Sequence, residues 1–241
     1  QPSNIKGKNP FKDQRVRQAL YQSIDMNTIQ RVVMRGWAQP TGTLIAHHVN
    51  GWTKQVDKRF AFDPEASKNL LTQAGYPNGF EVDFSCPAGR YPSDEALCQA
   101  ISAQWAKVGI KAKLRTYPFA TYFPMIQRYE ASLYLLGWSV PTFDAFYSLQ
   151  ALLRSPGAGG DGNFNLGRFS DPQQDAMIER VRTETDLKLR NQLIEKVLLN
   201  EHKTISHIPL FNLITPWAAS KKVQIPTRAD NYIDWRALKV N

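Results

Sequence analysis

The fold class follows first from the alternation of helical and strand patterns along residues 63–136. Asp63-Pro64-Glu65 is a strong helix start, with a capping residue, proline at the first helical position and an acid in the first turn. Residues 80–86 alternate apolar and polar side chains, as a half-buried strand does. The segments that follow are predicted to be a helix over 94–108 capped by Ser93, a strand over 110–116, a helix over 120–128 and a strand over 133–136. This order predicts an α/β fold in which helices flank a shared sheet.

The last of these strands leads into an irregular segment rich in aromatic and polar side chains. Leu133–Leu136 is an apolar run that predicts a buried strand, and the following Gly137-Trp138 and Pro141 end it. Ligands of α/β folds sit past the carboxyl ends of strands, so we expect a binding site here. Trp138 could cover a flat or apolar group, and Asp144 could hold a cation. The alternative interpretation makes Trp138 a core aromatic and Asp144 a helix cap.

A glycine-rich loop over 155–168 follows, and it is expected to be mobile or tightly turned. It lacks the glycine spacings of nucleotide-binding loops, which excludes a phosphate cradle. Asn163 and Asn165 are the polar side chains in it best able to reach a ligand; the alternative is that they satisfy local backbone groups. The candidate ligand-binding residues are therefore Trp138, Ser139, Pro141, Thr142, Phe143, Asp144, Tyr147, Asn163 and Asn165.

The chain of 241 residues carries a net charge of +9, but its basic residues are dispersed and interleaved with acids. Nucleic-acid binders cluster lysine and arginine on one face, and no zinc-finger or RNA-binding motif is present, so a nucleic-acid partner is not expected. No apolar run approaches the ~20 residues that span a bilayer, so direct membrane insertion is not expected either. The sequence has no initiator methionine or signal peptide, which leaves open a mature amino terminus or a cut fragment.

Cysteine and histidine offer no catalytic or metal-binding pattern. Cys86 and Cys98 are compatible with one disulfide or with two free thiols. The pair His47-His48 lies in a predicted surface loop with no carboxylate or cysteine nearby, and His207 lies in an apolar segment, where a packed histidine is expected. No nucleophile elbow, zinc-protease or cysteine-histidine motif occurs. We therefore expect no enzyme activity, no catalytic residue, no metal and no cofactor.

The carboxy-terminal part predicts two helices and two short strands. Ser170-Asp171-Pro172 and Thr185-Asp186 are helix starts. Residues 205–211 and 217–220 are apolar enough to form strands, and the cluster 232–235 is expected to dock back on the core. No internal repeat or linker appears, so residues 1–241 are predicted to form a single lobe.

Several blocks of the sequence resemble one known family. NPFKDQRVRQALYQSIDMNTI, residues 9–29, closely resembles the segment that opens the second lobe of peptide/nickel-type (family 5) extracytoplasmic solute-binding proteins of ABC importers. Supporting blocks follow in the same order: DPEASKNLLTQAGYPNGF, WAKVGIKAKL, the Gly-Trp strand end and FSDPQQDAMIERV. The resemblance covers nearly the whole chain.

The resemblance implies a fold, a function and partners. The chain would be the carboxy-terminal lobe of a two-lobed protein twice its length. Its fold would be one lobe of a periplasmic-binding-protein type II-like fold, in which helices flank a mixed sheet. It would capture a peptide or related small molecule by hinge closure and deliver it to an importer. The implied partners are that ligand, the missing amino-terminal lobe and the membrane subunits of the importer, in the periplasm or another extracytoplasmic space. A surface or chaperone-like interaction domain and a hydrolase are the alternatives.

One position departs from the peptide-binding pattern of the family. Members that bind free peptides place an aspartate three residues after the tryptophan to pair with the ligand's amino group, and here that position is Pro141. A buried ammonium without its partner costs several kcal/mol. Asp144, three residues further on, is the candidate substitute, and Trp138 matches the family aromatic that packs on the ligand. A peptide, modified peptide, glycoside, opine-like compound or chelated metal all remain open as ligands.

Overall fold

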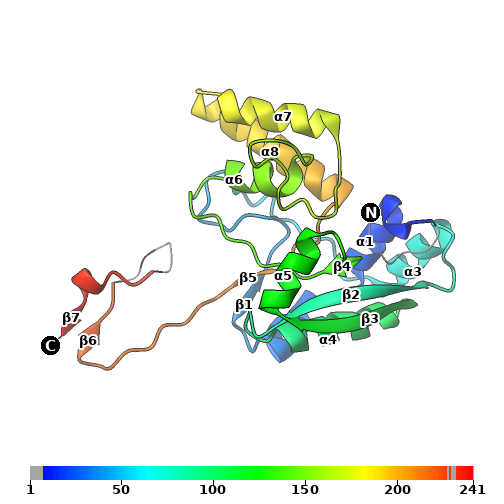
Figure 1. The fold of residues 1–241 in the computed structure, drawn as a ribbon, viewed down its shortest axis with the longest axis horizontal. Coiled ribbons are helices and arrows are strands. Elements are labelled where there is room, and N and C mark those ends of the chain that lie inside the picture. Colours follow the sequence, from blue (N-terminus) through cyan, green and yellow to red (C-terminus); the bar gives the residue numbers. More distant parts are fainter. Residues whose placement is uncertain (1–7, 227, 229–231, 241) are drawn as a thin grey trace.

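The structure, a computed structural model, describes residues 8–226, 228 and 232–240. The helices are α1 (Gln14–Gln22), α2 (Met26–Thr28), α3 (Pro64–Gln73), α4 (Asp94–Ala106), α5 (Phe119–Gln127), α6 (Phe146–Ser148), α7 (Pro172–Thr183) and α8 (Leu187–Thr204). Turns of π-helix, η2 (Ile29–Val33) and η3 (Leu149–Leu153), continue α2 and α6, and Pro10–Lys12 (η1) and Trp235–Ala237 (η4) are 3₁₀ turns. The strands are β1 (Ala38–Pro40), β2 (Phe80–Ala88), β3 (Ile110–Pro118), β4 (Leu133–Tyr134), β5 (Phe211–Leu213), β6 (Val223–Gln224) and β7 (Lys239–Val240). The α/β class predicted from the sequence is confirmed (Figure 1).

The main sheet is parallel, with strand order β3-β2-β4. β2 pairs along its whole length with β3 and is the central strand. β4 is shorter and less buried than the expected strand over 133–136: only Leu133 and Tyr134 pair with β2, and both are half-buried. After them the chain leaves the ladder: the Leu135 N–H lies 3.3 Å from the carbonyl oxygen of Ser85 but also donates to the hydroxyl oxygen of Tyr122 at 3.0 Å.

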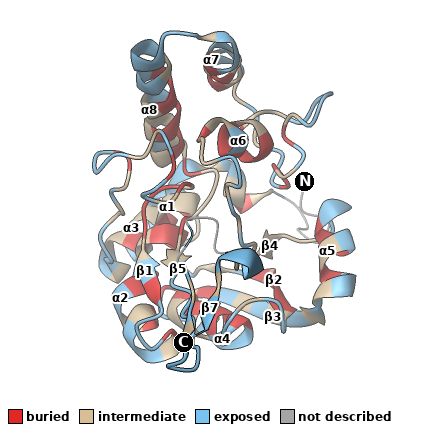
Figure 2. Cartoon of the chain, turned by 90° about the vertical axis from the view of Figure 1, so that its left-hand side faces the viewer, coloured by how far each residue is buried: buried red, intermediate tan, exposed pale blue. Residues whose placement is uncertain are grey.

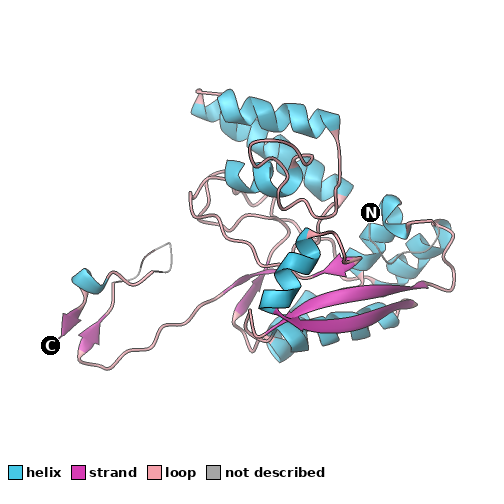
Figure 3. Ribbon diagram, in the orientation of Figure 1, coloured by secondary structure: helices cyan, strands magenta, loops and turns pink. Residues whose placement is uncertain are grey.

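Helices cover both faces of this sheet (Figure 3). Val82 and Phe84, which point to the same face of β2, pack against Leu97, Ile101 and Trp105 of α4 in one hydrophobic cluster. α5 lies on the opposite face, where Tyr122 donates a hydrogen bond to the carbonyl oxygen of Leu135 (2.7 Å). Ser93 is the N-cap residue of α4, as predicted, but its side chain makes no capping bond; the Asp94 carboxylate accepts the backbone N–H groups of Arg90, Tyr91 and Glu95 instead.

A second hydrophobic cluster holds α6, η3, α7 and α8 together above the sheet, and Figure 2 shows the buried residues along one side of α8. Asp171 and Asp186 cap α7 and α8, as predicted. Of the expected apolar face of α8, Leu193, Val197 and Leu198 are buried. This helical part therefore has a hydrophobic core of its own, separate from the core at the sheet.

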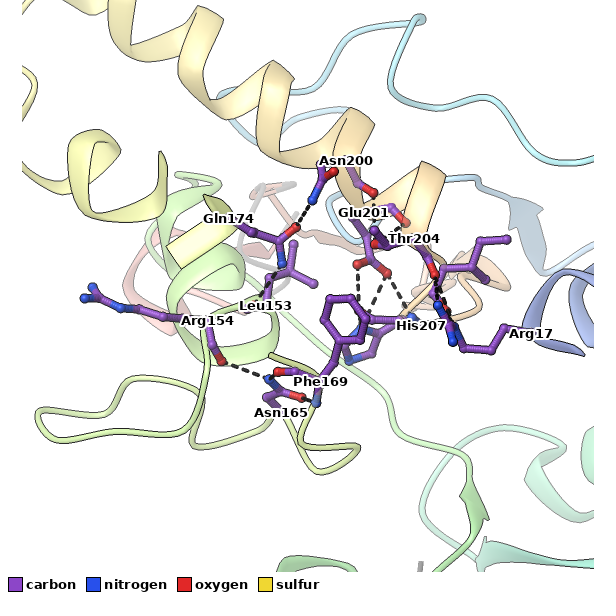
Figure 4. A network of polar contacts seen from close by, with 12 residues as sticks. Arg17, Leu153, Arg154, Asn165, Phe169, Gln174, Asn200, Glu201, Thr204 and His207 are labelled. Atoms are coloured by element: carbon purple, nitrogen blue, oxygen red, sulfur yellow. Dashed lines mark hydrogen bonds and ion pairs between the residues drawn. The ribbon is translucent and has the colours of Figure 1, made fainter. Parts of the chain in front are cut away.

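Half-buried arginines join the two hydrophobic clusters. Arg17 of α1 donates to the carbonyl oxygens of Thr204 (2.6 Å) and Ile205 (2.9 Å) at the end of α8 (Figure 4). Arg59 donates to the carbonyl oxygens of Thr41 (2.6 Å) and Pro209. Because the guanidinium groups satisfy carbonyls that no helix or strand pairs, the segment after α8 is tied to both clusters.

Cys86 and Cys98 form a disulfide, which decides between the two alternatives left open by the sequence. The bond joins the end of β2 to α4, with Cα atoms 6.5 Å apart, and both residues are fully buried. It therefore lies between the sheet and its covering helix.

The carboxy-terminal segment differs from its prediction. The expected strand over 205–211 begins only at Phe211, where β5 pairs antiparallel with β1, and residues 217–220 form no strand. The described residues among 214–240, here called the arm, lead away from the body to a β6–β7 hairpin (Figure 1). The expected docking of 232–235 on the core is wrong, since Tyr232 is 76% exposed and Trp235 74% exposed.

Among the described residues, no helix combines the length and apolar character needed to cross a membrane.

Candidate functional site

The candidate site lies at the carboxyl edge of the parallel sheet, where three connections meet. Trp138 follows β4, Arg90 and Tyr91 follow β2, and Phe119 follows β3. Parallel strands bring their carboxyl ends to one edge of a sheet, and that edge is where α/β proteins bind ligands.

Trp138 stands half-buried at this edge and has three partners. Its ring stacks on Tyr147 (centroids 5.3 Å apart, interplanar angle 23°) and meets Phe164 edge-on at 5.0 Å. Its Nε1–H donates to the hydroxyl oxygen of Ser148 (3.0 Å). The indole is thus fixed in orientation while part of its surface stays accessible.

Further rings extend this arrangement into a continuous aromatic surface. Phe164 lies 6.1 Å from Phe123, which stacks on Phe119 at 5.5 Å. The aromatic wall, as we call it, consists of Phe119, Phe123, Trp138, Tyr147 and Phe164. Three of its five members, Phe119, Phe123 and Phe164, were missed by the sequence reasoning, because their common position depends on chain segments far apart in sequence.

Arg90 adds a positive charge to this edge. Its guanidinium carbon lies 5.2 Å from the ring centre of Tyr91 and 5.0 Å from that of Phe119. The Tyr91 ring in turn covers Gly137, where an added Cβ would lie 2.6 Å from Tyr91 Cε1. No carboxylate of the described residues forms an ion pair with Arg90. The strand-end rule that singled out Trp138 also applies to the turn after β2, and would have found Arg90.

Asp144 does not offer a free carboxylate. Arg190 of α8 binds it through two hydrogen bonds, Nη1 to Oδ2 at 2.7 Å and Nη2 to Oδ1 at 2.8 Å, and Asn50 donates a third at 3.2 Å. Burial by itself raises the pKa of Asp144, but the hydrogen bonds from Arg190, the Phe146 N–H and Asn50 and the charge of Arg190 outweigh it and hold the pKa below its usual value. Oδ1 also accepts the Phe146 N–H (2.9 Å) at the start of α6, which is the capping role left open above.

The remaining candidates divide into exposed and committed side chains. Ser139, Pro141 and Thr142 are exposed, Phe143 is half-buried with its ring 5.7 Å from that of His48, and Asn163 is exposed. Asn165 is only 1% exposed, and its amide is taken up by backbone groups. The structure therefore brings Trp138 and Tyr147 together, and gives Asp144 and Asn165 other partners.

The other histidine, carboxylate and pocket features of the described residues lie apart from this edge. No group of three or more histidine, cysteine, aspartate or glutamate side chains among the described residues could hold a metal ion. His207 is half-buried, and its Nδ1 lies 2.9 Å from the hydroxyl oxygen of Ser206, which donates to the buried carboxylate of Glu201 (2.6 Å). A hollow of about 500 Å³ between residues 50–53 and α8 is lined mostly by polar side chains and contains none of the predicted site residues.

The α/β fold described above matches that of periplasmic binding proteins of known structure. Residues 3–160 match the model of the family "Bacterial extracellular solute-binding proteins, family 5 Middle", and the chain belongs to this family. The members of this family are extracellular solute-binding proteins of bacteria. The family resemblance read from the sequence is confirmed.

The chain is similar to binding proteins for chemically different ligands. It is 31% identical to "Heme-binding protein A" of Haemophilus influenzae over 84% of this chain and 37% of the relative. It is 28% identical to "Probable deoxycholate-binding periplasmic protein YgiS" of Escherichia coli over 91% and 42%. The solved structure of the periplasmic binding protein DppA from Helicobacter pylori in complex with the peptide STSA matches with a TM-score of 0.78 and 25% identity, over 85% and 39%. The chain thus spans less than half the length of each.

Proposed function

We propose that this chain is the carboxy-terminal lobe of a two-lobed protein that captures a carboxylate-bearing solute with an apolar or planar body. The captured solute would be passed to an ABC importer from the periplasm or another extracytoplasmic space. The observation that carries the proposal is Arg90, a guanidinium without an ion-pair partner among the described residues, held at the same edge as the aromatic wall.

Arg90 has the geometry of an anion receptor. Its guanidinium lies over the rings of Tyr91 and Phe119, and these contacts attract the charge without neutralising it. The backbone N–H groups of Arg90 and Tyr91 are held by Asp94 at 2.9 and 3.0 Å, so the turn that carries the side chain is fixed. A guanidinium forms two parallel hydrogen bonds with a carboxylate, which makes a carboxylate the best-matched ligand group.

The aromatic wall supplies the complementary surface for the body of the solute. Aromatic side chains bury large areas and stack against flat groups. Tyr147 is 37% exposed, and Trp138 beside it is half-buried, so both retain accessible ring surface. A solute held by Arg90 at one end would lie along this wall.

Neither of the two positions expected to supply a carboxylate for a ligand amine offers a free one. Pro141 has no charge, and Asp144 is bound by Arg190. An ammonium group would therefore find no free carboxylate here. We infer that the solute either lacks a free amine or binds it through the other lobe.

The ligands named for the relatives agree with this chemistry. Heme, deoxycholate and a peptide differ in size and shape, but each carries at least one carboxylate. A carboxylate is the group that such ligands have in common. A binding site that combines a carboxylate receptor with an aromatic surface would suit all of them.

The exposed arm supports the two-lobed part of the proposal. Trp217, Tyr232 and Trp235 are 50%, 76% and 74% exposed, which is unusual for side chains of this size. An amino-terminal lobe that packs on the arm would bury them and bring its own contacts to the solute. Contacts of the ligand with both lobes would then stabilise the closed form.

The experiment is to purify the two-lobed protein from its native compartment, unfold it and identify the released small molecule by mass spectrometry. We expect an organic acid with an apolar or planar part. A neutral or purely cationic solute would overturn the proposed ligand class.

A pair of variants of that protein tests the role of Arg90. Arg90→Gln should lower the affinity for the released acid by about 10- to 150-fold, since hydrogen bonds to charged groups contribute about 1.5–3 kcal/mol. Arg128→Gln is the matched control, because Arg128 is also an exposed arginine but follows the opposite end of α5, paired with Glu130. Equal affinities for the two variants would remove Arg90 from the site.

A further inference from the structure

We infer that the glycine-rich loop over 155–168 holds Phe164 in the aromatic wall, and that Asn165 and Asp161 are the residues that position it. Phe164 is the only contribution of this loop to the wall as defined above. The inference rests on the proposed function in taking the aromatic wall to be a solute-binding surface, but its test needs no ligand.

Asn165, the residue after Phe164, is fully used by the backbone around it. Its Nδ2 donates to the carbonyl oxygens of Arg154 (2.9 Å) and Phe169 (2.7 Å), and its Oδ1 accepts the Phe169 N–H at 3.1 Å (Figure 4). With the side chain only 1% exposed, water cannot replace these bonds without opening the loop. The amide therefore closes the loop directly behind Phe164.

The backbone on the other side of Phe164 is fastened to η3. Gly162 and Phe164 donate their N–H groups to the carbonyl oxygens of Gln150 (2.8 Å) and Ala151 (2.9 Å). Gly162 has φ +60°, and a Cβ there would overlap the carbonyl oxygen of Arg154, so only glycine permits this close approach. The glycine thus serves the placement of the loop rather than its mobility.

Asp161 ties the loop to two elements through charge. Its carboxylate pairs with Arg154 Nε (3.1 Å) from the end of η3 and Arg182 Nη2 (2.7 Å) from α7, and accepts Gln150 Nε2 at 3.0 Å. Glu179 of α7 binds the same Arg154 at 2.5 Å. The Asp161 side chain is only 14% exposed, so salt screens these pairs little.

The position of Phe164 decides whether the wall is continuous. Its ring lies 5.0 Å from Trp138 and 6.1 Å from Phe123, and so it connects the rings after β4 with those of α5. A displaced Phe164 would leave two separate aromatic groups and free one side of the Trp138 ring.

Fluorine NMR of the full chain labelled with 5-fluorotryptophan tests this inference without any ligand. The Trp138 resonance is assigned by its loss in Trp138→Phe, and Phe164→Leu should displace it. Asn165→Asp and Asp161→Asn should move it toward the Phe164→Leu position, whereas Asp161→Glu should return it toward the wild-type position. The Trp105 resonance, from the core on the α4 side of the sheet, reports that each variant is folded.

Glu130→Gln, which removes an exposed carboxylate paired with Arg128, is the matched control and should leave the Trp138 resonance in place. The inference is overturned if Asn165→Asp and Asp161→Asn leave the Trp138 resonance unmoved while Phe164→Leu displaces it. It is also overturned if Phe164→Leu itself has no effect. Because no solute is present, these outcomes are separate from a failure to capture an acid.

Discussion

At the scale of single residues, Trp138 is the member of the aromatic wall that contacts both Tyr147 and Phe164. Trp138→Ala in the two-lobed protein should weaken solute binding by about 1–3 kcal/mol, the value of burying a large apolar side chain. Isothermal titration with the solute released from the wild-type protein measures this loss.

Trp138→Phe is the control for that substitution. It keeps a ring between Tyr147 and Phe164 but removes the Nε1–H that Ser148 accepts. We expect most of the affinity to survive. Unchanged affinity in Trp138→Ala would show that the solute binds elsewhere.

His202 gives the stability of the chain a dependence on pH. Its ring stacks on Phe60 (centroids 4.5 Å apart, interplanar angle 6°), and burial lowers its pKa, against the opposing charge of Glu201. Because the pKa is lower in the folded state, the unfolded chain takes up the proton first as the pH falls. Stability is therefore full above the unfolded pKa of about 6.5 and declines below it.

The measurement is urea unfolding of the wild type and His202→Phe at pH 7 and pH 5. The phenylalanine keeps the stacking on Phe60 and cannot be protonated, so the loss of stability between the two pH values should shrink. His47→Phe, at an exposed histidine, should leave that loss as in the wild type. An undiminished loss in His202→Phe would assign the pH dependence to other groups.

Residue roles were predicted from the sequence only where the local pattern decides them. Trp138 stands at the strand end where the rule for α/β folds places it. Asp144 and Asn165 have the chemistry of ligand-binding residues, but their partners Arg190 and Phe169 are visible only in the structure. Arg90 also follows a strand end, but its place over the ring of Phe119, from a distant part of the chain, is visible only in the structure.

At the scale of elements, the Cys86–Cys98 disulfide links β2 to α4 across a sequence separation of 12. A loop of this size should stabilise the folded state by about 2–4 kcal/mol, mainly by restricting the unfolded chain. Replacing both cysteines by alanine should lower the free energy of unfolding by that amount, measured by urea denaturation.

Dithiothreitol provides the internal control for the disulfide. It should lower the midpoint of the wild type toward that of the double variant, and should not change the double variant. Equal midpoints for all four samples would mean that the bond does not constrain the unfolded state.

Helix starts were predicted better than strands, for a physical reason. The caps Asp63, Asp171 and Asp186 bond to N–H groups two or three residues away, so the signal is local. β5 forms only where it pairs with β1, which lies in a distant part of the chain. The apolar run over 205–211 carries no local signal for that pairing. The strand was therefore predicted at the wrong residues, because the sequence does not show which segment pairs with it.

At the scale of the whole molecule, the arm should contribute little to the stability of the body. Removing residues 217–241 keeps the bond from the Ile214 N–H to the Trp37 carbonyl and deletes the exposed hairpin. We expect the free energy of unfolding to change by no more than about 0.5 kcal/mol, as for surface changes in general. Urea unfolding of the full and shortened chains measures this difference.

The same deletion in the two-lobed protein should abolish solute capture if the arm joins the lobes. A large loss of stability in the shortened chain would instead mean that the arm packs on the body in solution. The expected docking of 232–235 failed at this scale, since an apolar cluster shows that a partner surface is needed without showing where that surface lies.

The ties between α1 and the end of α8 also set the order in which the molecule assembles. Arg17 bonds to Thr204 across 187 positions of the chain, so this contact carries a large loop-closure cost. Contacts within the β2–α4–β3 unit are far more local and are expected to form first. The rings of the aromatic wall come from segments between residues 119 and 164, so their contacts are also much closer in sequence than the contact of Arg17 with Thr204. We therefore expect the aromatic wall to form before α1 and the end of α8 are joined.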